Sequence, residues 1–350
     1  MEISVFSAET QGMPLYPNDL DRRIWAEELE DFVPSRIFDA HLHCLYRDCC
    51  LSKEGDEPPE YKTTEHLNLD KYDRADIDDT FAKLFPGREV HYLLFGWVFR
   101  RNDFDGNNAF TAAQVADDPL SAALMQIHPS FSVDKVEADL DKYGFHGFKP
   151  YRLWADDEVN CRVTDMMPEP LIELANDRHL IIMMHIGKSE GIADEQNITD
   201  LLHLAEKYPD VRWDLAHMAR ASIAWPLERA IDRIKEVPNF WYDFSSAAYS
   251  DVFTVAFRNI ALDRIMFGTD FPCDLIKGNM LSFGYGWDLV TEEHLAAMNI
   301  THCDPRATYS HYETLRAFKR AAGFEGYGRP QIEDIFFNNA MKFVHPGTSP

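Results

Sequence analysis

The chain has 350 residues, 45% of them hydrophobic, so it can bury a large core, and wholesale disorder is excluded. Its 34 Lys and Arg residues against 59 Asp and Glu residues give a formal net charge of −25. This acidic surplus argues against a nucleic-acid-binding surface and against docking on anionic membranes, although it does not determine the charge inside a pocket.

The sequence shows no signal for a membrane or for an oxidising compartment. Residues 1–10 lack a basic region followed by an apolar run, and no apolar stretch reaches the about 18 residues of a membrane-spanning helix. The 6 cysteines form no CxxC pair, and Cys49 and Cys50 are adjacent. We therefore expect a reduced, cytoplasmic protein without a disulfide scaffold.

In chain order, the first informative segment begins with the apolar pair Ile37 and Phe38 and continues with alternating polar residues, Asp39, His41 and His43. Side chains two residues apart share a face of a strand, whereas on a helix they diverge by about 200°. If this segment is a strand, the two histidines form a pair of nitrogen ligands that suits zinc. A strand with two structural histidines is the alternative, and a lone His-x-His motif would favour it.

An N-terminal extension with an expected helix at 19–32 precedes this strand, and a long polar excursion at 46–88, with a helix at 76–85, follows it. Short apolar segments then alternate with helical patterns. After the first strand at 36–43, strands are expected at 89–99, 121–127, 147–151, 179–185, 211–217, 240–244 and 264–268. Helices between them are expected at 108–118, 133–143, 168–176, 199–208, 227–236 and 252–259.

This alternation indicates a parallel sheet buried on both faces, and eight repeats over about 240 residues match a (β/α)8 TIM barrel. An open doubly wound sheet is the alternative, but no Gly-rich turn follows the first strand. We expect one domain over 1–350, with the barrel core at about 36–275. Extra C-terminal helices within 276–350, at 292–299, 309–322 and 331–343, would cover its outside or bottom.

Polar side chains recur at the ends of these otherwise apolar strands, where barrels of this kind carry their active sites. Most are residue types that bind metals or transfer protons. They are His41 and His43 on the first strand, Lys149 on the fourth, His185 on the fifth, His217 on the sixth and Asp270 on the eighth. Their coincidence at strand ends favours a metal site over isolated structural histidines.

This set of segments resembles the amidohydrolase superfamily, most closely its amidohydrolase-related branch. The matching segments are 38–43, 147–149, 184–185, 215–217, 267–272 and an Asn-Ala-containing closing helix at 337–343. The resemblance, which covers residues 36–345, implies a distorted, metal-dependent barrel. That branch contains hydrolases, lactonases, decarboxylases and hydratases, and its barrels often form dimers, so a homodimer is a further expectation.

The resemblance implies that His41, His43, His185 and Asp270 hold one divalent metal, zinc in the first instance and manganese or another divalent ion as alternatives. Such a metal lowers the pKa of bound water and polarises a substrate carbonyl. Asp270 would also accept the proton of the water and pass it to the leaving group. His217 would polarise the substrate oxygen or stabilise developing negative charge.

Two further residues are implied less directly. In binuclear relatives a lysine at the position of Lys149 is carboxylated and bridges two metals, with His217 as a ligand of the second; we expect one metal, as in the related branch. The alternative is that Lys149 binds a substrate anion. Asp39 is expected behind the metal ligands, where it would hold an imidazole in place.

Basic residues follow several strand ends, which is notable in so acidic a chain. Arg47, Arg100, Arg101, Arg152 and Arg220 lie there, and we expect Arg47, Arg152 and Arg220 to bind a small anionic substrate, in particular a carboxylate. The alternative for each arginine is an ion pair with an acidic loop residue.

The sequence therefore predicts a metal-dependent hydrolase that cleaves an amide, ester or lactone bond of a small carboxylated compound. The alternative is a decarboxylase, or another carbon–carbon or carbon–oxygen lyase, that acts on an aromatic or unsaturated acid with the same ligands. A barrel that only binds a ligand is a third interpretation, which the complete set of strand-end residues disfavours.

Overall fold

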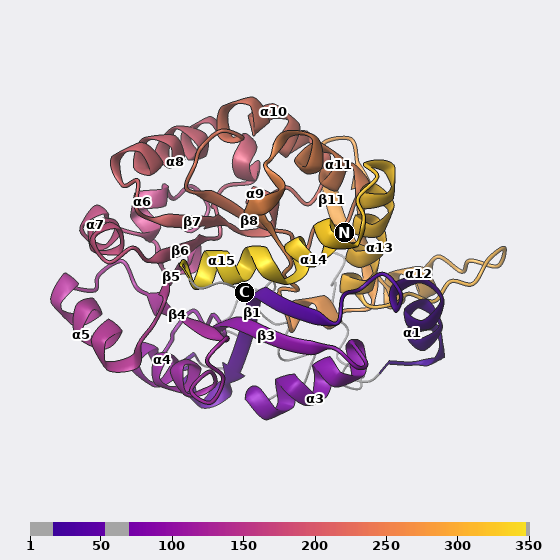
Figure 1. Cartoon of the computed structure of the whole chain (residues 1–350), viewed down its shortest axis with the longest axis horizontal. Coiled ribbons are helices and arrows are strands. Elements are labelled where there is room, and N and C mark those ends of the chain that lie inside the picture. Colours follow the sequence, from indigo (N-terminus) through magenta and orange to yellow (C-terminus); the bar gives the residue numbers. More distant parts are fainter. Residues whose placement is uncertain (1–16, 53–69, 348–350) are drawn as a thin grey trace.

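Apolar strand segments alternate with helices that carry one apolar face, and this pattern folds into a curved sheet inside a ring of helices (Figure 1). The computed structural model describes residues 17–52 and 70–347. The predictions for residues 1–10 and for part of the excursion, 53–69, lie outside these ranges.

One sheet has the strand order β2-β1-β3-β4-β5-β6-β7-β8-β9. All neighbours in it pair in parallel except β1 and β2, which are antiparallel. The strands are β1 (Arg36–Tyr46), β2 (Lys71–Tyr72), β3 (Glu89–Gly96), β4 (Ala122–Ile127), β5 (Gly147–Pro150), β6 (Ile181–Met184), β7 (Arg212–Leu215), β8 (Phe240–Asp243) and β9 (Ile265–Met266). Several are shorter than predicted, because residues at their carboxyl ends leave the ladder and turn toward the mouth of the barrel.

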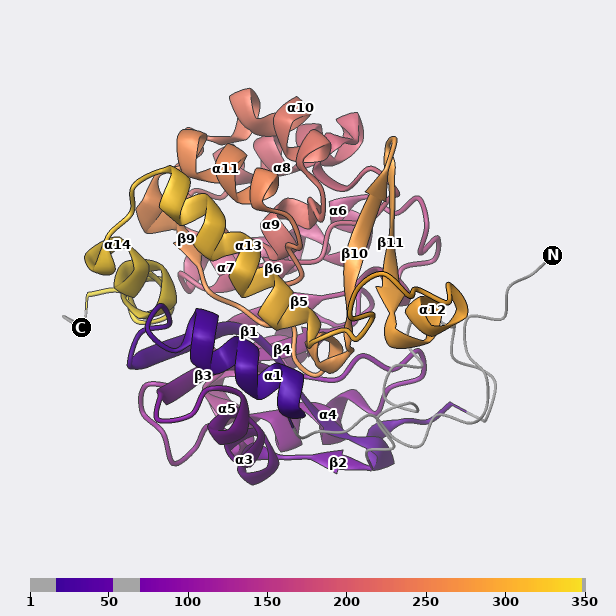
Figure 2. The same cartoon turned by 90° about the vertical axis from the view of Figure 1, so that its right-hand side faces the viewer.

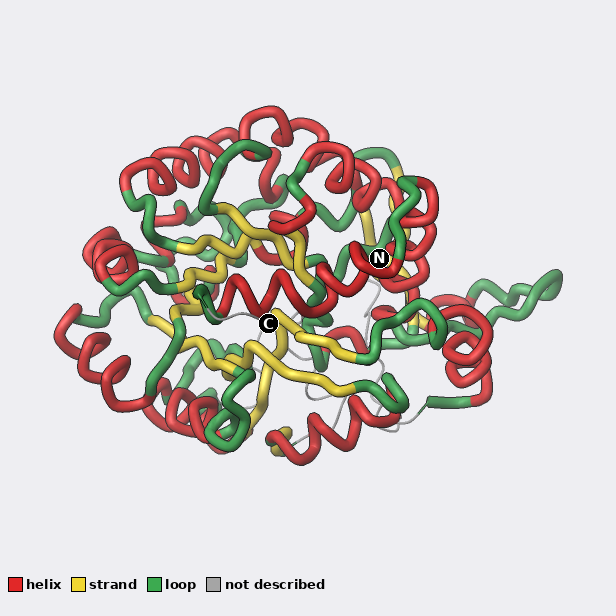
Figure 3. Tube along the Cα trace, in the orientation of Figure 1, coloured by secondary structure: helices red, strands yellow, loops and turns green. Residues whose placement is uncertain are grey.

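Helices form the outer ring around these strands (Figure 3). They are α3 (Arg74–Leu84), α4 (Phe104–Ala113), α5 (Val133–Tyr143), α6 (Val163–Met166), α7 (Glu169–Asp177), α8 (Glu195–Lys207), α10 (Ala224–Ile234) and α11 (Ser250–Asn259). The segment α9 (Ala216–Arg220) is not part of this ring, because it is a largely buried turn after β7 with left-handed φ/ψ values at His217, Met218 and Ala219. After β9 the chain adds α12 (Glu292–Ala297), α13 (Ser310–Phe324), α14 (Arg329–Glu333), the π-helix η8 (Asp334–Asn338) and α15 (Asn339–Val344).

Backbone hydrogen bonds between β1 and the segment that follows β9 close the sheet into a barrel. The Ala40 N–H donates to Phe267 O at 2.9 Å, the Asp270 N–H to His41 O at 2.8 Å, and the His43 N–H to Phe271 O at 2.9 Å. This closure confirms the predicted (β/α)8 barrel and makes it irregular, because β9 itself spans only Ile265–Met266.

Of the C-terminal helices, η8 and α15 cover the bottom of the barrel and α13 packs on its outside against α11, as predicted, whereas α12 lies against the hairpin strand β11. In Figure 1, α15 crosses the end of the barrel at the amino ends of the strands. Phe337, Ala340 and Phe343 from this segment join the buried residues of the barrel interior, which include Phe38 and Leu124. The plug of η8 and α15 therefore shares one apolar core with the inner faces of the strands.

The N-terminal helical segment is α1 (Asp19–Ile24) continued by a π-helix, Trp25–Leu29. A buried ion pair fixes α1 to the chain after β9: Lys277 Nζ lies 2.7 Å from Asp21 Oδ2, and the Thr308 hydroxyl donates to Asp21 Oδ1 at 2.8 Å. Both charged side chains are nearly inaccessible, at 7% and 0% exposure, so each needs the other as a partner.

The sequence analysis missed a β-hairpin made of β10 (Gly278–Phe283) and β11 (Gly286–Thr291). It stands upright on one side of the molecule in Figure 2. Only a weak signal was present: Gly284 lies in the two-residue turn and has a positive φ of 59°, which such turns require at this position.

Within the described residues, no helix is both long and apolar enough to cross a membrane. This finding agrees with the absence of a predicted transmembrane helix. The reduced, cytoplasmic location stays a prediction.

A pH dependence of stability follows from His311 on α13, which is buried at 3% exposure. Burial lowers its pKa to about 4, from the usual 6.5. Between these pH values the unfolded chain binds a proton that the folded chain rejects, so the free energy of unfolding falls as the pH falls. We expect His311→Asn to reduce this slope by about 1.4 kcal/mol per pH unit, measured by denaturant unfolding between pH 6.5 and 4.

The matched control is His302→Asn at an exposed position. It should leave the slope of the unfolding free energy against pH as it is in the wild type. An unchanged slope in His311→Asn would show that His311 binds its proton equally well in the folded and unfolded protein, which would contradict the lowered pKa.

Candidate metal centre

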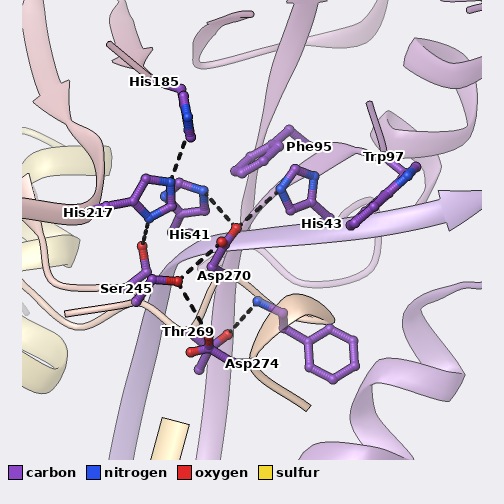
Figure 4. Close-up of polar contacts among 12 residues, drawn as sticks. His41, His43, Phe95, Trp97, His185, His217, Ser245, Thr269, Asp270 and Asp274 are labelled. Carbon is purple, nitrogen blue, oxygen red and sulfur yellow. Dashed lines mark hydrogen bonds and ion pairs between the residues drawn. The ribbon is translucent and has the colours of Figure 1, made fainter. Parts of the chain in front are cut away.

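Two histidines of β1 and one carboxylate converge at the carboxyl end of the barrel. His41 Nε2 lies 3.3 Å and His43 Nε2 3.4 Å from the same atom, Asp270 Oδ1, and Figure 4 shows both rings directed toward this carboxylate. The three ligand atoms lie within 4.8 Å of one another. Neutral imidazole nitrogens with one carboxylate oxygen fit a divalent zinc-like ion.

The second nitrogen of each ring is held from behind. His41 Nδ1 lies 2.9 Å from Asp243 Oδ2, and His43 Nδ1 lies 3.2 Å from Gly96 O. These contacts fix the ring orientations and leave both Nε2 atoms facing Asp270. This is the arrangement that orients metal-binding histidines in proteins.

Burial and neighbouring charges shift the pKa values of the candidate ligands at this centre. Burial opposes ionisation of Asp270, but the adjacent His217, His41 and His43 hold its pKa well below the usual value. Burial lowers the pKa of His43. Burial and the nearby Lys149 lower the pKa of His41, but Asp243 and Asp270 together outweigh both and raise it to about 9. A metal that bound at His41 Nε2 would compete with a proton there, so its affinity would depend on pH.

His185 and His217 form a second pair beside this cluster. His185 Nδ1 lies 3.1 Å from His217 Nε2, and His217 Nδ1 lies 2.8 Å from Ser245 Oγ. The Ser245 hydroxyl donates to Asp243, so it accepts from His217 Nδ1–H, and His217 Nε2 then accepts from His185 Nδ1–H. This chain leaves His185 Nε2 without a proton, as a metal ligand must be.

The structure does not place His185 with the trio of His41, His43 and Asp270, so its ligand role stays a prediction. A second trio of possible ligand atoms joins His41, His217 and Asp243. The Asp243 carboxylate already accepts hydrogen bonds from His41 Nδ1 and from the Ser245 hydroxyl, which in turn contacts His217. We therefore interpret this second trio as the group that orients the His41 and His217 rings.

The backbone is strained where it presents the site. His217, Met218, Ala219 and Arg220 have φ values of 59°, 50°, 57° and 59°, and Asp270 has 61°. A left-handed conformation costs a non-glycine residue about 1–2 kcal/mol. Such strain persists where surrounding contacts over-determine it, which is typical of functional sites.

The Lys149 side chain is buried and ends beside the candidate metal ligands. It is fully buried, and its Nζ lies 3.2 Å from His41 Nε2 and 4.3 Å from the centre of the Phe95 ring. Burial lowers its pKa to about 8. It does not line the pocket described below. The single metal stays the prediction, and carboxylation of Lys149 stays its alternative.

A pocket of about 250 Å³ opens beside the cluster. His185, His217, Asp270 and Arg220 line one part of it, and Ile276, Met280, Trp287 and Leu289 provide an apolar wall from the hairpin and the segment before it. Arg220 Nη1 donates to Ile186 O at 3.1 Å, which fixes its guanidinium at the rim. The pocket therefore joins a candidate metal centre, a cation and an apolar surface.

The other predicted anion-binding residues lie elsewhere. Arg47 Nε is 3.6 Å from Asp70 Oδ1, and Arg152 Nη1 donates to Glu158 O at 3.3 Å; neither lines this pocket. Arg100 pairs with Glu158 at 3.0 Å. Arg47 and Arg100 therefore make ion pairs with acidic residues, as in the alternative, whereas Arg152 contacts a backbone carbonyl. Arg220 is the predicted arginine that lines this pocket, and substrate binding by Arg47 and Arg152 stays a prediction.

Asp39 does not hold an imidazole, contrary to the prediction. Its Oδ1 accepts from the backbone N–H groups of His41 at 3.1 Å and Thr269 at 3.0 Å, and its Oδ2 accepts from the Thr269 hydroxyl at 2.6 Å. Asp39 therefore joins the backbone of β1 at His41 to the backbone at Thr269, which are the two segments that close the barrel.

Sequence reasoning missed the residue that does hold an imidazole, Asp243. The signal was available, because Asp243 is a charged residue within the apolar segment 240–244, at the same relative place as the other strand-end residues. Ser245 was missed too, since a serine after a strand carries no distinct pattern.

Comparisons with known proteins agree with this geometry. A family model described as amidohydrolase matches residues 38–345. No curated protein matches the chain in sequence. A structure of 2,6-dihydroxybenzoate decarboxylase with 2,6-dihydroxybenzoate is 14% identical, with a TM-score of 0.56, and the match covers 89% of this chain and 99% of that chain.

Two other solved structures show the same likeness. A dihydroxybenzoic acid decarboxylase from Polaromonas sp. JS666, with bound manganese and 2-nitroresorcinol, is 15% identical over 90% of this chain and 98% of its own, with a TM-score of 0.57. A probable 2-pyrone-4,6-dicarboxylic acid hydrolase from Acinetobacter baumannii is 11% identical over 88% of this chain and 98% of its own, with a TM-score of 0.56. At these low sequence identities the structural likeness shows that the fold is shared.

The contact between Asp243 and His41 gives a test of the centre. In Asp243→Asn an amide replaces the carboxylate that orients His41 and binds Ser245, so we expect Zn²⁺ affinity to fall about 10- to 100-fold. Competition with a chromophoric chelator measures this affinity. Asp251→Asn, which removes a charge from an exposed position, is the control and should bind Zn²⁺ as the wild type does. A folded Asp243→Asn protein with wild-type affinity would contradict the assignment.

Proposed function

Since the chain belongs to the amidohydrolase family, we propose that it is a metal-dependent hydrolase that cleaves an amide, ester or lactone bond of a small carboxylated compound. The observation that carries this proposal is the carboxylate of Asp270, which lies between the His41 and His43 nitrogens and lines the pocket next to His217 and Arg220.

The residues available to hold a divalent metal are His41, His43 and Asp270, with His185 Nε2 as a fourth candidate. Zinc is the first expectation, and manganese is supported by the neighbour that was solved with it. Such an ion, when bound, supplies a Lewis acid that activates water and polarises a carbonyl group.

In this proposal Asp270 accepts the proton of the attacking water and passes it to the leaving group. His217 has its proton on Nδ1, so its Nε2 is an acceptor in the resting enzyme. Burial lowers its pKa to about 4, and His41 and Lys149 add to this effect against Asp270 and Asp243, so the ring is neutral in the resting enzyme. It would polarise a substrate oxygen as the neutral tautomer that carries its proton on Nε2. Arg220 binds and orients the substrate carboxylate.

Decarboxylation of an aromatic or unsaturated acid is the second candidate. The apolar wall that contains Trp287 and Met280 faces the same pocket as Arg220, and such a wall fits the flat face of an unsaturated acid. Decarboxylases are also among the solved structures that share the fold. The two reactions differ in their products, because only decarboxylation releases carbon dioxide.

A product assay separates these candidates. The Zn²⁺- or Mn²⁺-loaded protein is incubated with aryl lactones, esters and amides that carry a carboxylate, and with the corresponding free acids. We expect new carboxylate or alcohol groups from the first set and no carbon dioxide from the second. Carbon dioxide from a free acid without hydrolysis of the first set would reverse the order of the two candidates.

Arg220→Met tests substrate binding once a turned-over compound is found. We expect KM to rise about 10- to 100-fold with a small effect on kcat, because the arginine binds the carboxylate in the ground state and the transition state alike. Arg229→Met, at an exposed arginine, is the control and should leave KM unchanged. An unchanged KM in Arg220→Met would exclude Arg220 from substrate binding.

A further inference from the structure

A second group of oxygen atoms lies beside the candidate metal centre, and the proposed chemistry does not use it. Asp274 and Asn279 line the pocket together with Ser246. Asp274 is only 4% exposed, yet its Oδ2 has no hydrogen-bond partner in the described part of the chain. The buried Asn279 Oδ1 also lacks a partner among these residues. Because an unsatisfied buried polar atom costs about 1–3 kcal/mol, two of them on one pocket wall call for an explanation.

Ser246 stands between two carboxyl groups at an unusual distance from both. Its Oγ lies 3.4 Å from Asp270 Oδ2 and 3.4 Å from Asp274 Oδ1. A strong O–H···O hydrogen bond spans about 2.5–3.0 Å, and one hydroxyl has a single proton to donate. Ser246 therefore cannot satisfy both groups. Its backbone has a positive φ of 55°, so the surrounding structure holds the hydroxyl in this place against an unfavourable conformation.

These separations match the spacing of neighbouring oxygen ligands around one ion. At the metal–oxygen distances of Ca²⁺, about 2.3–2.6 Å, two ligands at a right angle lie about 3.3–3.7 Å apart. The corresponding spacing for Mg²⁺ is about 2.8–3.0 Å, which is too short for the contacts of Ser246. The available atoms are carboxyl, hydroxyl and amide oxygens, which hard cations prefer, whereas the histidines of β1 suit a zinc-like ion.

The protonation state of Asp274 depends on whether such an ion is bound. Burial and the nearby Asp270 raise its pKa, so the protonated form is favoured in the protein without the ion. A proton on Oδ1 can be donated to Ser246, but it leaves Oδ2 without a donor. A cation that displaces this proton, as metals do at other ligands, provides a partner for the carboxylate.

We propose that Asp274 and Oδ2 of Asp270, with the Ser246 hydroxyl between them, bind a hard cation of the size of Ca²⁺. Asn279 Oδ1 is a further ligand, and water completes the coordination. The two oxygens of Asp270 then have different partners, because Oδ1 faces the histidines of β1. The ion joins the segments after β8 and β9 to the start of β10, and so it fixes the hairpin wall of the pocket to the candidate metal centre.

Tb³⁺ luminescence tests this proposal, because Tb³⁺ prefers the same ligands as Ca²⁺ and is excited by a nearby tryptophan. Trp287 lines the pocket. In Zn²⁺-loaded protein we expect saturable emission that Ca²⁺ displaces at lower concentration than Mg²⁺. So few carboxylates place the dissociation constant for Ca²⁺, measured by calorimetry, at about 10⁻⁴–10⁻³ M. Trp287→Phe should remove most of the emission and leave this constant unchanged.

Asp274→Asn keeps the shape and one acceptor oxygen but removes the charge. The affinity for Ca²⁺ should fall at least about tenfold, whereas the affinity for Zn²⁺ should change far less because the histidines of β1 are intact. Asp251→Asn, which removes a charge from an exposed position, is the control and should bind both ions as the wild type does. An unchanged affinity for Ca²⁺ in a folded Asp274→Asn protein overturns the proposal.

His43→Ala distinguishes the two ions. It removes an imidazole, so Zn²⁺ binding should weaken, while the Tb³⁺ emission and its displacement by Ca²⁺ should persist. Parallel loss of Zn²⁺ and Tb³⁺ binding would place both ions at the histidines and overturn the proposal. A wild-type protein that binds Ca²⁺ but no Zn²⁺ would support the hard-cation site and contradict the metal centre of the proposed function.

Ser246→Ala keeps the test decisive if Asp274→Asn proves to be unfolded by circular dichroism. It removes the hydroxyl that lies between the two carboxyl groups, so the affinity for Ca²⁺ should fall about threefold or more. An unchanged affinity would then overturn the proposal. Absence of saturable Ca²⁺ binding to the wild type would do so too, since water would then be the partner of these oxygens.

Discussion

The closure of the barrel between β1 and the segment after β9 is the interaction on which the site depends. Three backbone hydrogen bonds across it place Asp270 beside His41 and His43, because the Asp270 N–H itself donates to His41 O. Asp39 adds side-chain bonds to both edges, to the backbone of His41 and to Thr269. The same bonds that turn an open sheet into a barrel therefore assemble the candidate ligands.

Strain is concentrated where this closure meets the pocket. His217, Arg220, Ser246 and Asp270 all line the pocket and all have positive φ values. Each of these residues is unfavourable in isolation, so the conformation must be imposed by its surroundings. The surroundings are rigid: Asp243 fixes His41 and Ser245, and the plug of η8 and α15 fills the barrel below them. The well-packed amino end of the barrel thus supports the strained backbone at its carboxyl end.

Most of the fold, but less of the site, could be predicted from the sequence. Periodicity revealed the eight strands, since buried parallel strands are continuous apolar runs, and the His-x-His spacing predicted a shared face for His41 and His43. The role of Asp39 was misjudged and Asp243 was missed, because a hydrogen bond across 202 residues leaves no local pattern. The hairpin after β9 was missed because polar and apolar residues do not alternate regularly in its two strands. Loop arginines such as Arg152 were predicted to bind the substrate, because their hydrogen-bond partners, such as Glu158 O, cannot be identified from the sequence.

The closing bonds also determine when the protein can begin to work. Thr269 meets Asp39 across 230 positions of the chain, so the two halves of the centre leave the ribosome on the order of ten seconds or more apart. During that interval β1 has an unpaired edge, which is the part of a nascent sheet most exposed to wrong partners. The plug is synthesised later still. If a metal binds at this centre, its ligand set is complete only after Asp270 has been synthesised and the barrel has closed, so mutations that delay closure would lower the yield of loaded protein before they alter its chemistry.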